Sequence, residues 1–224
     1  MLIGLIIPVF LSGQVVSDSL MDKLRNSEVD TNQVYTLFKV SRELRSQYPD
    51  SSRTYLIRAL ELSQKLNFID GITRSMNKIG FSYLREGDYN LAKLWFKKTI
   101  ILLRKNDDVQ RLGHTLMNLG AVASLQGDYT ASLAYYEESL YIAEQTNDVE
   151  VIGKLANNIG YLQMEMGKTN KALESFYRAL DSYELTKDDY GRGVTSGNIG
   201  GVYLELKDYH KGISWQLKCF NIFR

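Results

Sequence analysis

Hydrophobic residues recur every three or four positions along most of the chain, with polar residues between them. Leu116, Leu119 and Val122 show this spacing, which places their side chains on one face of a helix. The helical pattern stops at short segments such as Gly127-Asp128-Tyr129 and then resumes. Glycine adopts the left-handed conformation that ends a helix, and aspartate caps the next helix by accepting from its free amides. The pattern therefore predicts helical hairpins.

A short sequence motif recurs every 40 residues. It consists of an apolar residue that follows asparagine or lysine and precedes glycine. A turn segment begins seven residues after each of these glycines, and a small residue stands twelve residues after the glycine. The glycines are Gly80, Gly120, Gly160 and Gly200, and the small residues are Ala92, Ser132, Ala172 and Gly212. Such self-similarity indicates one hairpin copied several times. A further step of 40 residues back reaches Val40, in a degenerate first copy that lacks the glycines.

Glycine inside a helix costs about 1 kcal/mol relative to alanine, so each of these repeated glycines needs a structural reason. We expect the small residue of the second helix, such as Ala92 or Ala172, to meet the glycine face with no side chain between the two helices. On this account Gly160→Leu would unfold the array.

Composition removes several classes of function. The 224 residues are 44% hydrophobic and 24% charged, which is typical of a folded protein, and the net charge of +1 argues against nucleic acid as a partner. One cysteine, Cys219, and two histidines, His114 and His210, are too few for a disulfide framework or a histidine-built metal centre. No phosphate-binding loop, nucleophile elbow or kinase signature occurs. We therefore expect no catalytic residue, no metal and no cofactor.

The first 17 residues carry no charge and are largely apolar up to Leu11. This run is too short to cross a bilayer comfortably but suits a secretory signal, although no basic residue precedes it. Residues 1–17 are thus predicted to be a signal peptide or an N-terminal hydrophobic segment packed on the fold, and residues 18–30 a linker. The first reading places the protein outside the cytoplasm, periplasmic or otherwise extracytoplasmic. The second leaves it cytoplasmic.

The apolar residue before glycine, the Gly-Asp-Tyr turn and the small residue that follows resemble the tetratricopeptide repeat. The resemblance covers about residues 31–224, and the 40-residue unit is similar to the variety found in peptide-sensing regulators and kinesin light chain relatives. It implies an all-α fold, a right-handed α–α superhelix of about five helical hairpins. The implied repeats are 31–70, 71–108, 109–148, 149–188 and 189–224, the last of them truncated.

Stacked hairpins of this family form a groove lined by the first helices, and such grooves bind segments of other proteins. The resemblance places a set of polar residues there: Arg74, Asn77, Lys78, Asn118, Lys154, Asn157, Asn158 and Asn198. Side-chain amides both donate and accept, so a column of asparagines could hold the backbone of an extended peptide. Alternatively, these asparagines bond to neighbouring helices and stiffen the stack.

We therefore expect a non-enzymatic scaffold that binds a protein or peptide. An array of this kind after a signal peptide resembles the extracytoplasmic region of bacterial sensor histidine kinases and transcriptional regulators, which suggests the sensory or interaction part of a larger signalling protein. Two alternatives stay open: a cytosolic peptide-responsive regulator or adaptor, and the N-terminal part of an enzyme whose catalytic domain lies beyond residue 224. No nucleic acid contact in this segment, and no membrane contact beyond the N-terminal segment, is expected. Self-association through an open C-terminal end is possible.

Overall fold

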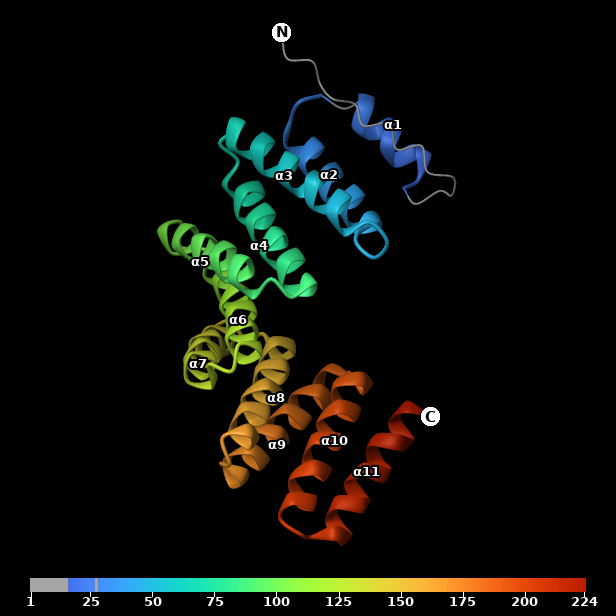
Figure 1. Ribbon diagram of the computed structural model, residues 1–224, viewed down its shortest axis with the longest axis vertical. Coiled ribbons are helices and arrows are strands. Elements are labelled where there is room, and N and C mark those ends of the chain that lie inside the picture. The colour runs from blue at the N-terminus through green and yellow to red at the C-terminus, as the bar shows by residue number, and fades with distance from the viewer. Residues whose placement is uncertain (1–15, 27) are drawn as a thin grey trace. The chain divides into compact units, whose positions relative to one another are not determined.

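A computed structural model describes residues 16–26 and 28–224 of the chain. Over these residues eleven α-helices follow one another and no strand occurs, as Figure 1 shows. This confirms the predicted all-α fold built from helical hairpins. Nearly all of the predicted signal segment, residues 1–15, lies outside the described residues.

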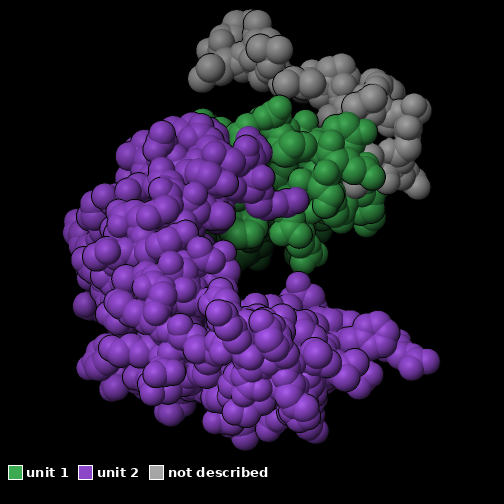
Figure 2. Space-filling view, turned by 60° about the horizontal axis from the view of Figure 1, so that its bottom comes forward, with its two compact units in different colours: residues 1–82 green, residues 83–224 purple. Residues whose placement is uncertain are grey.

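A short helix, α1 (Asp18–Asn26), comes first, and ten longer helices follow. Four hairpins pair α2 (Thr31–Leu44) with α3 (Pro49–Lys65), α6 (Val109–Leu125) with α7 (Tyr129–Gln145), α8 (Val149–Glu165) with α9 (Thr169–Thr186), and α10 (Asp189–Glu205) with α11 (Tyr209–Phe223), while α4 (Ile69–Glu86) and α5 (Tyr89–Lys105) lie between the first two of them in the chain. The chain divides into two compact units, unit 1 up to residue 82 and unit 2 from residue 83 to 224, which Figure 2 colours separately. Each unit is described by itself.

In unit 1, helix α1 falls within residues 18–30, which the sequence had suggested to be a linker. Its apolar residues Leu20, Met21 and Leu24 lie on one helical face and pack with Val34 of α2. Leu24 itself is buried. A terminal hairpin has no neighbour on one side, so α1 covers apolar surface that would otherwise meet water.

The first hairpin, α2 with α3, differs from the others by one residue in its turn. In the hairpin of α6 and α7, the Ser132 hydroxyl donates to the carbonyl oxygen of Gly120 at 2.8 Å. In unit 1, the Ser52 hydroxyl donates in the same way to the carbonyl of Ser41, also at 2.8 Å. The sequence separation is eleven residues in unit 1 and twelve in unit 2. Ser41, and not Val40, therefore takes the place of the repeated glycine.

In unit 2, aspartates start most helices as the sequence predicts. Asp128, for example, accepts a hydrogen bond from the amide of Ala131 at 3.0 Å. Lys168, which begins α9, provides no such side-chain cap. The preceding turns take the left-handed conformation, with φ of 77° at Gly127 and 53° at Asn147. These turns fix where each helix of unit 2 begins.

The repeated glycines of unit 2 do lie against the second helix of their own hairpin, but the contact differs from the predicted one. A Cβ atom at Gly160 would lie 2.7 Å from the ring of Phe176, and one at Gly120 would lie 2.6 Å from the ring of Tyr136. An aromatic side chain therefore covers each of these glycines, whereas the expectation placed no side chain there. The predicted contact of the small residue with the glycine is present beside the ring at Gly120, since the Ser132 hydroxyl donates to the Gly120 carbonyl oxygen.

Unit 2 curves because its first helices are closer together than its second helices. Helix α8 packs directly against both α6 and α10. The second helices α7 and α9 are bridged by long side chains, through the ion pair between Glu144 and Arg178. The first helices accordingly line the inner side of the curve that Figure 2 shows for unit 2.

Candidate binding surface

The half-exposed residues of α6, α8 and α10 form the inner surface of unit 2. Five of the eight residues predicted for the groove lie on these helices: Asn118, Lys154, Asn157, Asn158 and Asn198. All five are partly buried, which leaves a polar edge toward solvent while their helices pack beneath.

Two of the predicted asparagines touch across the boundary between neighbouring hairpins. The side-chain oxygen of Asn157 on α8 accepts a hydrogen bond from the amide nitrogen of Asn198 on α10 at 3.0 Å. The same oxygen accepts from the hydroxyl of Thr195 at 2.9 Å. Thr195 is fully buried, so this second bond satisfies a hydroxyl that has no access to water. We call Asn157 and Asn198 the amide pair.

Asn158 points to a different partner, the hydroxyl of Tyr136 on α7. Burial raises the pKa of Tyr136 to about 12, and the hydrogen bonds from Ser132 and Asn158 offset part of that rise. This contact also joins two hairpins. The alternative reading, in which asparagines stiffen the stack, thus has contacts that fit it at Asn157, Asn158 and Asn198.

Two other residues of this surface, Thr195 and Tyr161, were not predicted from the sequence. Thr195 precedes Asn198 by three residues and so shares its helix face, which is the signal that could have revealed it. Tyr161 on α8 is 43% exposed, and its pKa is raised by burial of its hydroxyl and by the carboxylate of Glu165. Glu165 also accepts a hydrogen bond from Tyr129 at 3.4 Å. Lys154 pairs with Glu150 one turn earlier on α8.

The other three predicted groove residues, Arg74, Asn77 and Lys78, belong to α4 in unit 1. Arg74 donates to Asp70, at 2.8 Å between its Nε and the nearer carboxylate oxygen. Asn77 is half-buried. The ammonium of Lys78 lies 5.6 Å from the centre of the Phe38 ring on α2, a cation–π contact. Unit 1 thus brings Arg74 and Lys78 to the side of α4 that faces α2.

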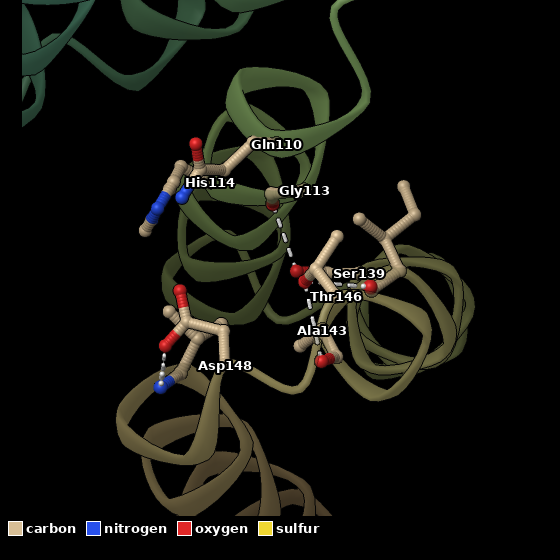
Figure 3. Close-up of a pocket in the computed structure, with 9 residues that line it drawn as sticks. Gln110, Gly113, His114, Ser139, Ala143, Thr146 and Asp148 are labelled. Carbon is tan, nitrogen blue, oxygen red and sulfur yellow. Dashed lines mark hydrogen bonds between the residues drawn. The ribbon is translucent and has the colours of Figure 1, made fainter.

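A small pocket lies where α6, α7 and the start of α8 meet, and Figure 3 shows its lining. His114 and Gln110 of α6 stand at one side, and the Ser139 hydroxyl crosses to the carbonyl of Gly113 at 2.8 Å. The space is about 10 Å³, which is room for a single water molecule. The pocket is therefore too small for a substrate.

Among the residues that the structure describes, no group of three or more histidine, cysteine or acidic side chains could hold a metal ion. Within the same residues, no helix combines the length and the apolar character that crossing a membrane requires.

Comparison with known proteins shows what part of the chain and its fold are similar to. Residues 111–184 match the model of the tetratricopeptide repeat. A search of curated proteins finds no match. Among solved structures, BtubC from P. vanneervenii superposes with a TM-score of 0.82 at 17% identity, over 91% of this chain and 86% of that one.

Two further structures share the fold. Aspartyl phosphate phosphatase F from Bacillus subtilis gives a TM-score of 0.71 at 15% identity, covering 92% of this chain and 63% of that chain. A Rap protein complexed with competence and sporulation factor gives 0.72 at 15% identity, covering 90% and 66%. The chain therefore spans about two thirds of the length of these two proteins. Residues 111–184 thus resemble the tetratricopeptide repeat in sequence, and the superpositions show that the chain shares the helical-hairpin fold of these structures.

Proposed function

We propose that the chain is a non-enzymatic scaffold whose inner surface of unit 2 binds a segment of another protein or a peptide. The observation that carries the proposal is the amide pair: Asn157 and Asn198 stand side by side on adjacent first helices and both remain partly exposed. A Rap protein with this fold was solved in complex with competence and sporulation factor, which makes a bound factor a reasonable expectation here.

Recognition would use the hydrogen-bonding capacity that the amide pair has left. The oxygen of Asn157 is occupied by Asn198 and Thr195, so its amide nitrogen is the group available to a backbone carbonyl of a ligand. The oxygen of Asn198 could in turn accept from a backbone N–H. Tyr161, exposed one turn further along α8, adds an aromatic surface for a side chain.

The test is selection of peptides from a random displayed library against the full chain. Selected peptides are then measured for affinity to Asn157→Asp, which keeps the oxygen that Thr195 and Asn198 need but removes the outward amide donor. We expect at least a tenfold loss of affinity, because a backbone carbonyl of the bound peptide would lose the hydrogen bond from the Asn157 amide. The matched control is Asn170→Ala, an exposed asparagine of α9 away from this surface. Equal affinity for wild type and Asn157→Asp would overturn the proposal.

We further propose that this scaffold is the sensory or interaction part of an exported signalling protein. The apolar run of residues 1–11 supports export, and the family resemblance supports signalling. Expression in a bacterial host followed by fractionation and N-terminal sequencing tests export. A soluble cytosolic product that retains Met1 would favour the cytosolic regulator instead.

A second candidate role is self-association through α11. Three apolar side chains one or two turns apart on this helix, Ile213, Leu217 and Phe220, are exposed by 57%, 56% and 62%. Burying such a stripe against a second copy would remove apolar surface from water. Light scattering should then show a dimer for the wild type and a monomer for Leu217→Glu. A monomeric wild type at high concentration would rule this role out.

A further inference from the structure

Unit 1 has a face of its own where α2 and α4 meet. Tyr35 of α2 donates a hydrogen bond to Asp70 of α4 at 2.9 Å. The ammonium of Lys78 lies over the Phe38 ring, one turn further along both helices. These two contacts fix the register of α2 against α4. Phe38 and Arg42 are four residues apart and Arg45 follows three later, so all three share one side of α2.

The positive charges of this face lack counter-charges. Within the described residues, neither Arg42, Arg45 nor Lys78 has a carboxylate at ion-pair distance, whereas Arg74 is paired with Asp70. We call Arg42, Arg45 and Lys78, together with the ring of Phe38, the basic face of unit 1. Glu43, adjacent in sequence, accepts from the backbone amide of Ser17.

The arginines near Lys78 repel its ammonium group. Burial of its ammonium, and then the charges of Arg74, Arg45 and Arg42, lower the pKa of Lys78. Lys78 is an exposed residue as a whole, so the loss of water concerns its ammonium end over Phe38. Like charges brought together without a partner destabilise the fold slightly, and a bound anion would relieve that cost.

The shape of the face favours several carboxylates over one compact anion. Arg42 and Arg45 lie at the carbonyl end of α2, which ends at Leu44, so no free helix amides converge there to cradle a phosphate. The cations are instead spread along about one turn of α2 and onto α4. Guanidinium groups hold carboxylates through paired hydrogen bonds, and the Phe38 ring can contact the methylenes of an acidic side chain. A broad membrane-binding surface is disfavoured by the net charge of +1.

We propose that the basic face of unit 1 binds the carboxylate side chains of an acidic segment of a partner protein. The basic face shares no residue with the inner surface of unit 2. A negative result for the basic face would therefore leave the proposed peptide binding by unit 2 intact, and a negative result for unit 2 would leave the basic face intact. Replacement of Lys78 should lower the affinity for the acidic segment without lowering the stability of the fold, because it removes the repulsion between Lys78 and the neighbouring arginines.

The experiment measures fluorescence anisotropy of a labelled peptide of alternating glutamate and alanine, mixed with the full chain at low and at physiological salt. A peptide of alternating lysine and alanine is the charge-reversed probe, and inorganic phosphate is the competitor. The variants are Lys78→Met and the double variant Arg42→Gln with Arg45→Gln. The control is Lys65→Met, which removes the same charge from an exposed position on another helix of unit 1, α3.

We expect binding of the acidic peptide to fall at least fivefold in Lys78→Met and tenfold or more in the double variant, with less than a twofold change in Lys65→Met. The melting temperature of Lys78→Met should be equal to or above that of wild type. The proposal is overturned by an equal loss in Lys65→Met, by equal binding of the lysine peptide, or by no binding of the acidic peptide. Displacement of that peptide by phosphate at equal concentration would instead assign the face to a free anion and also overturn it.

Discussion

Two glycines on first helices of neighbouring hairpins should respond to the same substitution in opposite directions. Gly160 lies in α8 and Gly201 in α10, both well inside a helix. A Cβ atom at Gly160 would lie 2.7 Å from the ring of Phe176, whereas a Cβ atom at Gly201 would have no atom within 4 Å. Replacement by alanine therefore changes helix propensity at both sites but packing at only one.

The magnitudes follow from these contacts. Alanine gains about 1 kcal/mol over glycine inside a helix, so Gly201→Ala should stabilise the chain by about 0.5 to 1 kcal/mol and raise the melting temperature by about 2 to 4 °C. At Gly160 the same gain is opposed by overpacking of about 1 to 3 kcal/mol. Phe176 is fully buried, so its ring has no solvent to move into. The net change at Gly160 should be a loss of up to about 2 kcal/mol, and Gly160→Leu, with a larger side chain, should unfold the hairpin.

Far-UV circular dichroism in urea measures both variants. Arrays of repeats can unfold in steps, so the comparison uses the transition midpoint and slope of each variant under one set of conditions. We expect the midpoint of Gly201→Ala above wild type and that of Gly160→Ala below it. An equal rise of both midpoints would refute the packing of Phe176 on Gly160.

An aspartate in place of Lys168 should cap α9, so we expect Lys168→Asp to stabilise the chain by about 0.5 to 1 kcal/mol in thermal melts. Lys168→Ala, which adds no cap, should not stabilise it. Removal of an existing cap in Asp128→Ala should cost about 1 kcal/mol. The folded chain should also lose stability in alkali. The pKa of Tyr136 is raised from 10.0 to about 12, so the unfolded chain releases this proton first, and stability falls as pH rises from 10.0 toward about 12. Tyr136→Phe should make that decline shallower in urea melts, and an unchanged slope would contradict the assignment.

The helices from α4 to α11 could be predicted because two independent signals agree there. The 40-residue step gives the register, and residues such as Asp128 and Asp148 mark helix starts through their caps. Helix α1 was missed for the opposite reason. Residues 18–26 contain four charged residues, which leave room for only a short apolar stripe. The stripe is buried only because α1 packs on a surface of α2 that the sequence does not reveal.

The contacts between elements were harder to foresee than the elements. A repeated glycine indicates close packing, but nothing in its spacing says that the group covering Gly160 is the ring of Phe176 and not the small side chain of Ala172. The asparagine column shows the same limit. Residues 40 apart occupy equivalent positions, yet the hydrogen bond joins Asn157 to Asn198, 41 apart, because one first helix is offset against the next.

The basic face of unit 1 could not be predicted from the 40-residue step, because the turn between α2 and α3 is one residue shorter than the turns of the later hairpins. Counting back by 40 places Val40 at the glycine position, which puts Arg42 in register with the buried Leu162. The shorter turn places Ser41 there instead, so Arg42 is equivalent to the exposed Tyr161. One residue turns a helical position by about 100°. Arithmetic on a repeat can therefore give the correct helices and still assign the wrong side of a helix to the groove, and only contacts such as that of Lys78 with Phe38 restore the register.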